Sequence, residues 1–280
     1  MSYALITGSA KGIGRSIAEE LAKLGYHLLL TDIDEINLEK TASEIVTKYG
    51  VNVKWLDVDL SQINSVQQLF DWSSPVHEEL EIVVNNAGYG LTGYFEQLSI
   101  QEQLGIVDVN VKAVVAISYQ FLPVLHQRKK AYLLNVGSTT AYQSVPYLAV
   151  YSATKAFILS YTRSLRFELR NTSVSVSCLV PGPTDTAWVQ RAGIGSHTLK
   201  VADIFNMSPD EVGAIGVKGL FRGKAEIIAG LSNKLNAFLP KFFPKKLVEG
   251  IGASLYDPSK NEKKRHEKTF LHKHEQVVGS

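Results

Sequence analysis

A tyrosine and a lysine, Tyr151 and Lys155, stand four positions apart in the stretch YLAVYSATKAF at residues 147–157. On a helix, side chains at positions i and i+4 lie on one face, so the phenol and the ammonium would be neighbours. Free tyrosine titrates at about 10, and a nearby positive charge stabilises its phenolate. The pair therefore suits a proton donor and the cation that tunes it, although the same spacing also suits two ordinary residues on a helix surface.

A second motif places three glycines where a strand-like run meets a helical pattern. Gly8, Gly12 and Gly14 form TGxxxGxG in TGSAKGIGRSIAEELAKLG, directly after the apolar residues 3–7. Glycines at such a junction let a phosphate approach backbone N–H groups at the positive end of a helix. The spacing differs from the GxGxxG dinucleotide fingerprint, and a tight turn is the alternative, but the placement favours a pyrophosphate site.

Acidic residues follow the second and third strand-like runs. Asp32 ends the run YHLLLT, 18 residues after Gly14, where a carboxylate suits the ribose hydroxyls of NAD and repels the 2′-phosphate of NADP. Lys11 argues the other way, because its ammonium could reach a 2′-phosphate. We expect NAD, with NADP possible because of Lys11. Asp59 is placed to accept from the adenine amino group or to cap the next helix, with Ser61 as the rival cap.

The elements that must position these residues are visible as short apolar runs between amphipathic stretches. The runs are YALIT, YHLLLT, VNVKWLDV, LEIVVNN, AYLLNVGS and VSVSCLV, and residues 13–24 and 65–72 are typical of crossover helices. This alternation predicts an α/β fold: a Rossmann-like, doubly wound parallel sheet with helices on both faces. No linker interrupts it, so we expect one domain over residues 1–230, followed by a basic extension over residues 231–280.

Composition narrows the classes of partner. The 280 residues are 45% hydrophobic and 20% charged, with a formal net charge of +2, which gives no basic field of the kind that nucleic-acid binders use. Cys178 is the only cysteine, so an internal disulfide is excluded. The chain starts almost at once with a strand-like run, and no apolar run approaches the ~18 residues of a membrane span. We expect a cytoplasmic protein that binds no nucleic acid.

The end of the chain has a different character. Residues 241–280 carry a net charge of +4, and the segment NKLNAFLPKFFPKKLVEGIGASLY interleaves leucine and phenylalanine with lysine. Such a pattern fits a helix pair that covers the substrate cleft or packs on a partner subunit, and we favour packing. A basic amphipathic segment on a membrane surface is the alternative. His266, His272 and His274 cluster in the tail, but no ligand spacing supports a metal site.

Six motifs in register resemble the short-chain dehydrogenase/reductase family. They are TGSAKGIG, NNAG at 85–88, Asn110 in VDVNVKA, Ser138 in LLNVGSTTA, YSATK at 151–155 and PGPTDT at 181–186, and the similarity runs over residues 2 to about 230. The ending NKLNAFLPKFFPKK is more loosely similar to that of bacterial ketoacyl or acyl-chain reductases. The resemblance implies hydride transfer between a nicotinamide and a carbonyl or alcohol carbon.

In that family the four matching polar residues are catalytic. Tyr151 would donate the proton, Lys155 would stabilise the phenolate and hold the nicotinamide ribose, Ser138 would hydrogen-bond the substrate oxygen, and Asn110 would anchor a water that links Lys155 to solvent. This chemistry needs no metal. Each residue also has an ordinary alternative: Ser138 as a turn residue, Asn110 as the partner of a buried backbone group and Tyr151 as an aromatic packed on the sheet.

The resemblance also assigns the cofactor contacts. They fall in the glycine loop, after the second, third, fourth and sixth strands, and on the catalytic helix: Gly8, Lys11, Gly12, Ile13, Gly14, Asp32, Asp59, Leu60, Asn86, Ala87, Gly88, Tyr151, Lys155, Pro181, Gly182, Thr184 and Thr186.

The residues beyond the sixth strand are loop-like and are expected to close over the substrate. We expect an apolar pocket, and hence apolar acyl-chain or steroid-like substrates, from the side chains of Leu91, Tyr94, Val145, Tyr147, Trp188, Val189 and Ile194. The family resemblance implies a homodimer or homotetramer built through helices within 102–127 and 152–170. Two other readings stay open: a dinucleotide-binding sensor or scaffold without turnover, and a membrane-surface protein directed by its basic C-terminal segment.

Overall fold

Seven parallel strands form one sheet in the order β3-β2-β1-β4-β5-β6-β7. The computed structural model describes residues 2–184 and 206–259 of the chain. The strands are β1 Tyr3–Thr7, β2 His27–Asp32, β3 Val53–Asp57, β4 Leu80–Asn85, β5 Ala131–Val136, β6 Val174–Val180 and β7 Glu226–Ile228. The predicted Rossmann-like doubly wound sheet in a single domain is confirmed.

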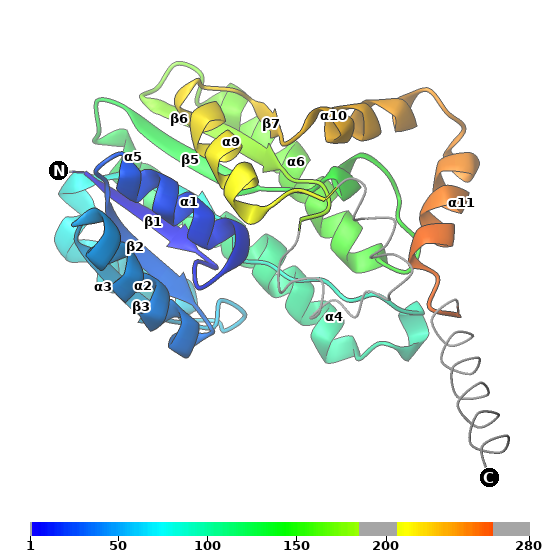
Figure 1. The fold of residues 1–280 in the computed structure, drawn as a ribbon, viewed down its shortest axis with the longest axis horizontal. Coiled ribbons are helices and arrows are strands. Elements are labelled where there is room, and N and C mark those ends of the chain that lie inside the picture. Colours follow the sequence, from blue (N-terminus) through cyan, green and yellow to red (C-terminus); the bar gives the residue numbers. More distant parts are fainter. Residues whose placement is uncertain (1, 185–205, 260–280) are drawn as a thin grey trace, which may run out of the picture.

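Helices cover both faces of the sheet (Figure 1). Successive residues of a strand point to opposite faces, so Ala4 and Ile6 of β1 belong to one core while Tyr3 and Leu5 belong to the other. The first core is closed by α1 Gly12–Lys23, α2 Glu35–Tyr49 and α9 Pro209–Phe221. The second is closed by α3 Ser65–Ser73, α5 Val114–His126 and α6 Ala149–Glu168, with short helical turns η1 Ser74–Glu79, η2 Phe95–Gln97 and η4 Thr139–Tyr142 in the connections.

The strand order reverses between β1 and β4. Chain connections leave the sheet in opposite directions at that point, which opens a crevice at the carboxyl ends of the strands. The glycine loop follows β1, the NNAG motif spans the end of β4, Ser138 follows β5 and Pro181 follows β6. The described residues of these four motifs therefore lie at one edge of the sheet.

One helical run in the described chain is long and apolar enough, by length and composition alone, to cross a membrane. It covers 27 residues, Ile100–His126, and contains an 18-residue window with a mean hydropathy of 1.3. The run joins α4 Ile100–Val107, the π-helical turn η3 Asp108–Ala113 and α5. The sequence analysis expected no such run, because Glu102, Asp108 and Lys112 interrupt the apolar residues of this segment. Ile117 and Phe121 are completely buried against the sheet, so the run serves as a core helix of the fold.

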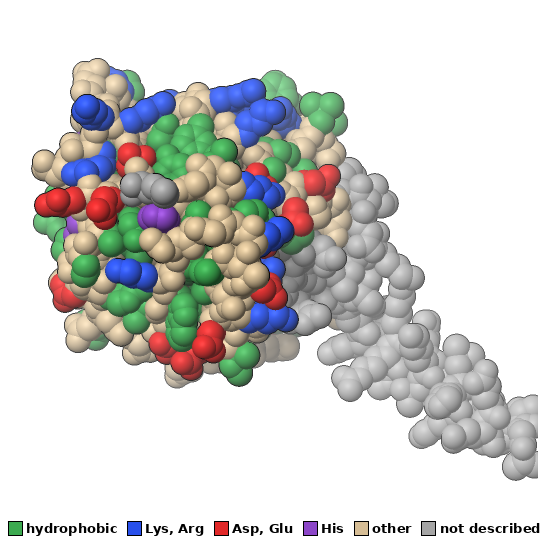
Figure 2. Space-filling view, turned by 60° about the vertical axis from the view of Figure 1, so that its left-hand side comes forward, with side chains coloured by type: hydrophobic (Ala, Val, Ile, Leu, Met, Phe, Trp, Pro, Cys, Tyr) green, Lys and Arg blue, Asp and Glu red, His purple; other side chains and the backbone are tan. Residues whose placement is uncertain are grey.

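The surface carries charges of both signs. Figure 2 shows one face, on which lysine and arginine side chains alternate with aspartate and glutamate and no single sign dominates. This agrees with the small net charge of +2.

The last strand is followed by α10 Leu231–Phe238, the turn η5 Leu239–Lys241 and α11 Lys245–Tyr256. Figure 1 shows α10 beside β7 and α11 at the rim of the molecule. The domain boundary expected at residue 230 stays a prediction. Helix α10, which follows that residue, packs directly on β7 and on η4.

Candidate active site

The glycine loop is built so closely that side chains would not fit. Gly8 has a φ of +66°, and a Cβ on Gly14 would lie 2.1 Å from the carbonyl oxygen of Gly8. Helix α1 begins at Gly12 and receives no side-chain capping hydrogen bond at its N-terminus, nor does its first turn hold an acidic residue. Its first N–H groups are therefore available to a pyrophosphate, and this cradle fits a dinucleotide.

The NNAG motif fastens the glycine loop to β4. The side-chain amide of Asn86 donates to the carbonyl oxygens of Thr7 and Gly8 at 2.9 and 2.8 Å. The Thr7 hydroxyl accepts from the backbone N–H groups of Asn86 and Ala87, both at 3.0 Å. Asn86 and Ala87 thus lie against the loop, as expected of cofactor contacts, and Thr7 is a brace that the sequence analysis missed.

Asp32 lies at the carboxyl end of β2 and also holds the glycine loop. Its Oδ2 accepts from the Ala10 N–H at 2.9 Å, while Oδ1 accepts from the N–H groups of Ile33 and Asp34 at 2.8 and 3.1 Å. Asp34 also forms an ion pair with Lys11 at 2.8 Å. The hydrogen bond from Lys11 is the main cause that holds the pKa of Asp34 below its ordinary value. Lys11, the cation expected to favour NADP, thus has a carboxylate partner.

Asp59 lies in a turn instead of capping a helix. Its Oδ1 accepts from the N–H and the hydroxyl of Ser61 at 2.9 and 2.8 Å, while α3 begins only at Ser65 with Asn64 at its N-cap. The capping alternative for Asp59 and Ser61 is therefore wrong. Asp59 lines a hollow of about 470 Å³ together with Ile33, whereas Leu60 beside it is buried in the core.

Tyr151 and Lys155, the expected catalytic pair, lie together on α6, close to its start. Tyr151 and Lys155 are both buried, and the Lys155 Nζ lies 5.7 Å from the centroid of the Tyr151 ring. Nζ donates to the carbonyl oxygen of Val136 at 2.9 Å, at the end of β5. Ser138, two residues further on, is hydrogen-bonded to the Tyr151 side chain. The structure therefore brings Ser138, Tyr151 and Lys155 together, as predicted.

Burial dominates the protonation of this pair. It raises the pKa of Tyr151 above its ordinary value, against the opposing hydrogen bond from Ser138. It also lowers the pKa of Lys155 from 10.5 to about 8. The expectation that Lys155 lowers the pKa of Tyr151 is not met in this structure, because burial raises that pKa and the Lys155 ammonium is directed to the Val136 carbonyl oxygen. Tyr151 is thus held in its protonated, donor form.

Asn110 serves the backbone beside Lys155. Its amide donates to the Tyr89 carbonyl oxygen at 3.0 Å and to the Thr154 hydroxyl at 3.1 Å, and its Oδ1 accepts from the Tyr89 N–H at 3.1 Å. A Cβ on Gly88 would lie 2.9 Å from that Oδ1 and 3.5 Å from the Lys155 Nζ. Asn110 is therefore a hydrogen-bond partner of backbone groups, which was its ordinary alternative. That Asn110 also holds a water stays a prediction.

The turn after β6 lies against α10. A Cβ on Gly182 would lie 2.1 Å from the Oδ1 of Asn233, a completely buried side chain whose Nδ2 donates to the Ala229 carbonyl oxygen at 2.8 Å. The Thr184 hydroxyl donates to the Gly182 carbonyl oxygen at 3.1 Å. Pro181, Gly182 and Thr184 therefore follow β6 at the cofactor edge, while Thr186 lies outside the described residues.

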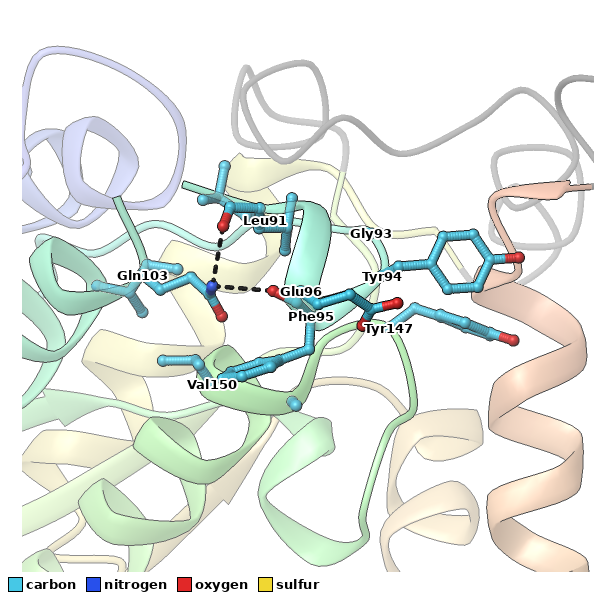
Figure 3. Close-up of a pocket in the computed structure, with 11 residues that line it drawn as sticks. Leu91, Gly93, Tyr94, Phe95, Glu96, Gln103, Tyr147 and Val150 are labelled. Atoms are coloured by element: carbon cyan, nitrogen blue, oxygen red, sulfur yellow. Dashed lines mark hydrogen bonds between the residues drawn. The ribbon is translucent and has the colours of Figure 1, made fainter. Parts of the chain in front are cut away.

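An apolar pocket of about 260 Å³ opens beside the start of α6. Figure 3 shows the Phe95 ring close to Val150, and the rings of Tyr94 and Tyr147 side by side. The two tyrosine rings are 5.4 Å apart in an edge-to-face contact, and Tyr147 adopts a φ of +66° while its carbonyl oxygen accepts from the Gly93 N–H. The expected pocket residues Leu91, Tyr94 and Tyr147 line it.

The other expected pocket residues lie elsewhere. Val145 packs with Leu148 and Tyr151, and Tyr256 of α11 packs against this cluster. Trp188, Val189 and Ile194 lie outside the described residues. Tyr256 belongs to the segment expected to cover the substrate cleft or pack on a partner subunit. The sequence analysis did not single out Tyr256 itself, because nothing in its surroundings links it to a residue more than a hundred positions earlier.

Comparison with known proteins identifies the family. Residues 2–195 match the short chain dehydrogenase family, so the chain belongs to it and is an oxidoreductase. Within the described residues, no group of three or more histidine, cysteine, aspartate or glutamate side chains could hold a metal ion. The nicotinamide dinucleotide that such enzymes use fits the open start of α1 and the glycine cradle.

Curated relatives include reductases of long acyl chains. The chain is 35% identical over 180 residues to a very-long-chain 3-oxoacyl-CoA reductase of Laccaria bicolor, covering 64% of this chain but 53% of that protein. It is 27% identical over 257 residues to the Mus musculus reductase of the same name, covering 90% and 80%. It is also 31% identical over 186 residues to the Homo sapiens inactive hydroxysteroid dehydrogenase-like protein 1, covering 64% and 54%.

Solved structures of similar fold hold both kinds of cofactor. A short-chain dehydrogenase from Sphingobium yanoikuyae in complex with NADPH is 25% identical, covers 92% of this chain and 96% of its own, and has a TM-score of 0.75. One from Burkholderia phymatum in complex with NAD is also 25% identical, covers 86% and 92%, and has a TM-score of 0.77. These likenesses support a nicotinamide dinucleotide without separating NAD from NADP.

Replacing Lys155 with methionine is expected to abolish turnover without loss of stability at pH 7. Below pH 8 the folded protein bears the cost of a buried ammonium. As the pH rises from about 8 to 10.5 the folded state loses this proton before the unfolded state does, so the wild type gains ~3 kcal/mol of stability relative to Lys155→Met. Urea unfolding of both proteins at pH 7 and pH 10.5 measures this change.

The exposed Lys54→Met variant controls for the chemistry of the substitution. If the difference in stability between the wild type and Lys155→Met stays constant across this pH range, the lowered pKa of the buried Lys155 is contradicted.

Proposed function

We propose that this oxidoreductase interconverts an apolar ketone and the matching secondary alcohol, with an acyl-chain or steroid-like substrate and NAD as the preferred cofactor. The observation that carries the proposal is the meeting of Ser138, Tyr151 and Lys155 beside the glycine cradle, next to an apolar pocket.

The chain's own groups supply binding and proton transfer. When bound, the nicotinamide supplies or accepts the hydride at the carbonyl carbon. The hydroxyls of Ser138 and Tyr151 hold the carbonyl oxygen, and Tyr151 releases its proton to that oxygen as negative charge develops there. Burial keeps Tyr151 protonated until then. The Lys155 ammonium lies close enough to attract the phenolate that remains.

The preference for apolar substrates rests on the pocket and on the relatives. Leu91, Leu98, Ile106 and Val150 line the pocket, and Tyr94 and Tyr147 stand at its side. Relatives named for very-long-chain 3-oxoacyl-CoA are consistent with an extended apolar chain on the substrate. A cytoplasmic location stays a prediction from the sequence.

A sensor without turnover is the second candidate, because two relatives are named inactive. Loss of activity is expected to remove a group that transfers or positions the proton. In this chain Ser138, Tyr151 and Lys155 are all present and adjacent, which favours the enzyme.

The Tyr151→Phe variant tests the proton donor. Removal of one hydroxyl is expected to lower kcat by about 10²–10⁴-fold, the contribution of general acid catalysis, while NADH binds nearly as before. The assay is turnover of ketones of graded chain length with each nicotinamide, together with a fluorescence titration of NADH. Tyr161→Phe, on the same helix, is the matched control. Wild-type rates in Tyr151→Phe would refute the assignment, and no turnover of any ketone by the wild type would favour the sensor.

The choice of NAD rests on the carboxylates around the loop. Asp32→Ala is expected to raise the ratio of NADPH to NADH affinity about tenfold or more, because one negative charge near the 2′-phosphate is removed. Affinity for both cofactors should also fall, since Ala10, Ile33 and Asp34 lose their acceptor.

Asp34→Asn is the companion variant, because it releases Lys11 and leaves Asp32 in place. It should strengthen NADPH binding and leave NADH binding unchanged. Isothermal titration with both cofactors measures these effects, and tighter binding of NADPH than of NADH by the wild type would overturn the choice of NAD.

We also propose a homodimer or homotetramer built through α5 and α6. Tyr119 of α5 and Phe157 and Phe167 of α6 are large apolar side chains left exposed in the single chain. Phe157 stacks on Tyr161 at 5.8 Å, which gives the helix a flat aromatic face. Light scattering is expected to report a multiple of the 30.8 kDa chain mass, and a monomer would contradict this proposal.

A further inference from the structure

Helix α10 and the turn after it turn their apolar side chains outward. Leu231, Leu235, Phe238 and Phe242 recur at the spacing of one helix face, and they are 82%, 57%, 55% and 67% exposed. The rings of Phe238 and Phe242 lie 4.8 Å apart, so the stripe is continuous. A helix of a globular domain normally buries such a face against its core.

The inner side of α10 is small and polar. Its buried residues are Asn233, which packs against Gly182, and Ala237. Helix α10 is therefore packed on the domain through its small and polar side. The apolar stripe is exposed in this packing. The sequence pattern reveals an apolar stripe, and the structure shows that it faces away from the protein.

Helix α11 exposes apolar side chains as well. Leu247 and Ile251, one turn apart, are 52% and 58% exposed, and Phe243 just before the helix is 48% exposed. The exposed residues Lys245 and Lys246 lie between Phe243 and Leu247 in sequence. The exposed residue Lys234 lies between Leu231 and Leu235 of α10. Residues 231–256 contain four lysines and one glutamate, for a net charge of +3.

Charge decides what such a surface can meet. A second copy of the same face would bring two charges of +3 together, which disfavours a symmetric dimer through this region. An anionic lipid surface satisfies both features, because leucine and phenylalanine enter the acyl boundary and lysine ammonium groups meet the headgroups. Neither a neutral bilayer nor an acidic protein would use both features as well.

We propose that the outer face of α10, η5 and α11 docks on the surface of an anionic lipid bilayer. The surface consists of Leu231, Leu235, Phe238, Phe242, Leu247 and Ile251 with the lysines between them. Docking is peripheral: α10 and α11 are 8 and 12 residues long, too short to span a bilayer, and both are amphipathic.

Helix α11 connects this surface to the candidate active site. Tyr256 at the end of α11 packs against the cluster of Val145, Leu148 and Tyr151, and Gly252 lies against Pro146. A docked α11 would therefore hold the wall of the site close to the lipid, where apolar ketones concentrate. This last consequence rests on the proposed function, whereas docking itself does not.

Vesicle cosedimentation of the full chain tests the docking surface. The wild type is expected to pellet with phosphatidylcholine vesicles that contain phosphatidylglycerol, and to stay in solution with phosphatidylcholine alone. Lys245→Gln/Lys246→Gln should lower the partition coefficient by roughly 30-fold, since each lysine at an anionic surface contributes about fivefold. Raised salt should weaken binding in the same direction.

The apolar stripe is tested by Leu235→Ser/Phe242→Ser, which should lower partition by at least about tenfold. Leu24→Ser/Ile36→Ser is the matched control, because these side chains, just after α1 and in α2, are 59% and 81% exposed. Both variants should turn over a soluble short-chain ketone at the wild-type rate, and equal circular dichroism shows that they are folded even if no ketone is turned over.

Three outcomes would overturn the proposal. The first is a wild type that fails to bind anionic vesicles, and the second is equal binding by the wild type and Leu235→Ser/Phe242→Ser. The third is a fall in the particle mass of that variant in lipid-free buffer, measured by light scattering, which would assign the surface to contact between protein chains.

Discussion

The burial of one ammonium group determines the electrostatics of the candidate active site. Lys155 is held inside the fold with a single described hydrogen bond, to the Val136 carbonyl oxygen, and its pKa is lowered to about 8. Loss of hydration makes such a position costly for a cation. A charge placed there would act on a phenolate of Tyr151 through a medium that screens it poorly. A side chain selected for stability alone would be apolar.

The surroundings of Lys155 depend on the reversal of strand order between β1 and β4. That reversal brings the ends of β4, β5 and β6 beside the glycine loop, and polar side chains fix the segments that leave these ends. Thr7 and Asn86 join the loop to β4, while Asn110 pairs with both backbone groups of Tyr89. Deeper in the sheet, Asn85 donates to Asn135, which donates to Thr162 of α6. The catalytic helix is thus positioned by hydrogen bonds as well as by packing.

Much of this arrangement follows from local sequence, and the rest does not. Short apolar runs and glycine spacing predict the sheet and the phosphate loop, because strand burial and backbone approach are local properties. The balance at Tyr151 could not be predicted, since it depends on how much water remains around two side chains after folding. The contact between Tyr256 and the Tyr151 cluster joins distant segments, and periodicity reveals the stripe on α10 without showing which way it faces. The role of Asn110 depended on the π-helical turn that directs its amide toward Tyr89.

The proposed activity is hydride transfer to an apolar carbonyl in the crevice at the carboxyl ends of the strands. Reduction of a long-chain ketone with NADH that carries deuterium at the transferable C4 position, followed by mass spectrometry of the alcohol, tests it most directly. One deuterium is expected on the carbinol carbon of the product. An alcohol without deuterium, or no alcohol from enzyme shown to bind NADH, would contradict it.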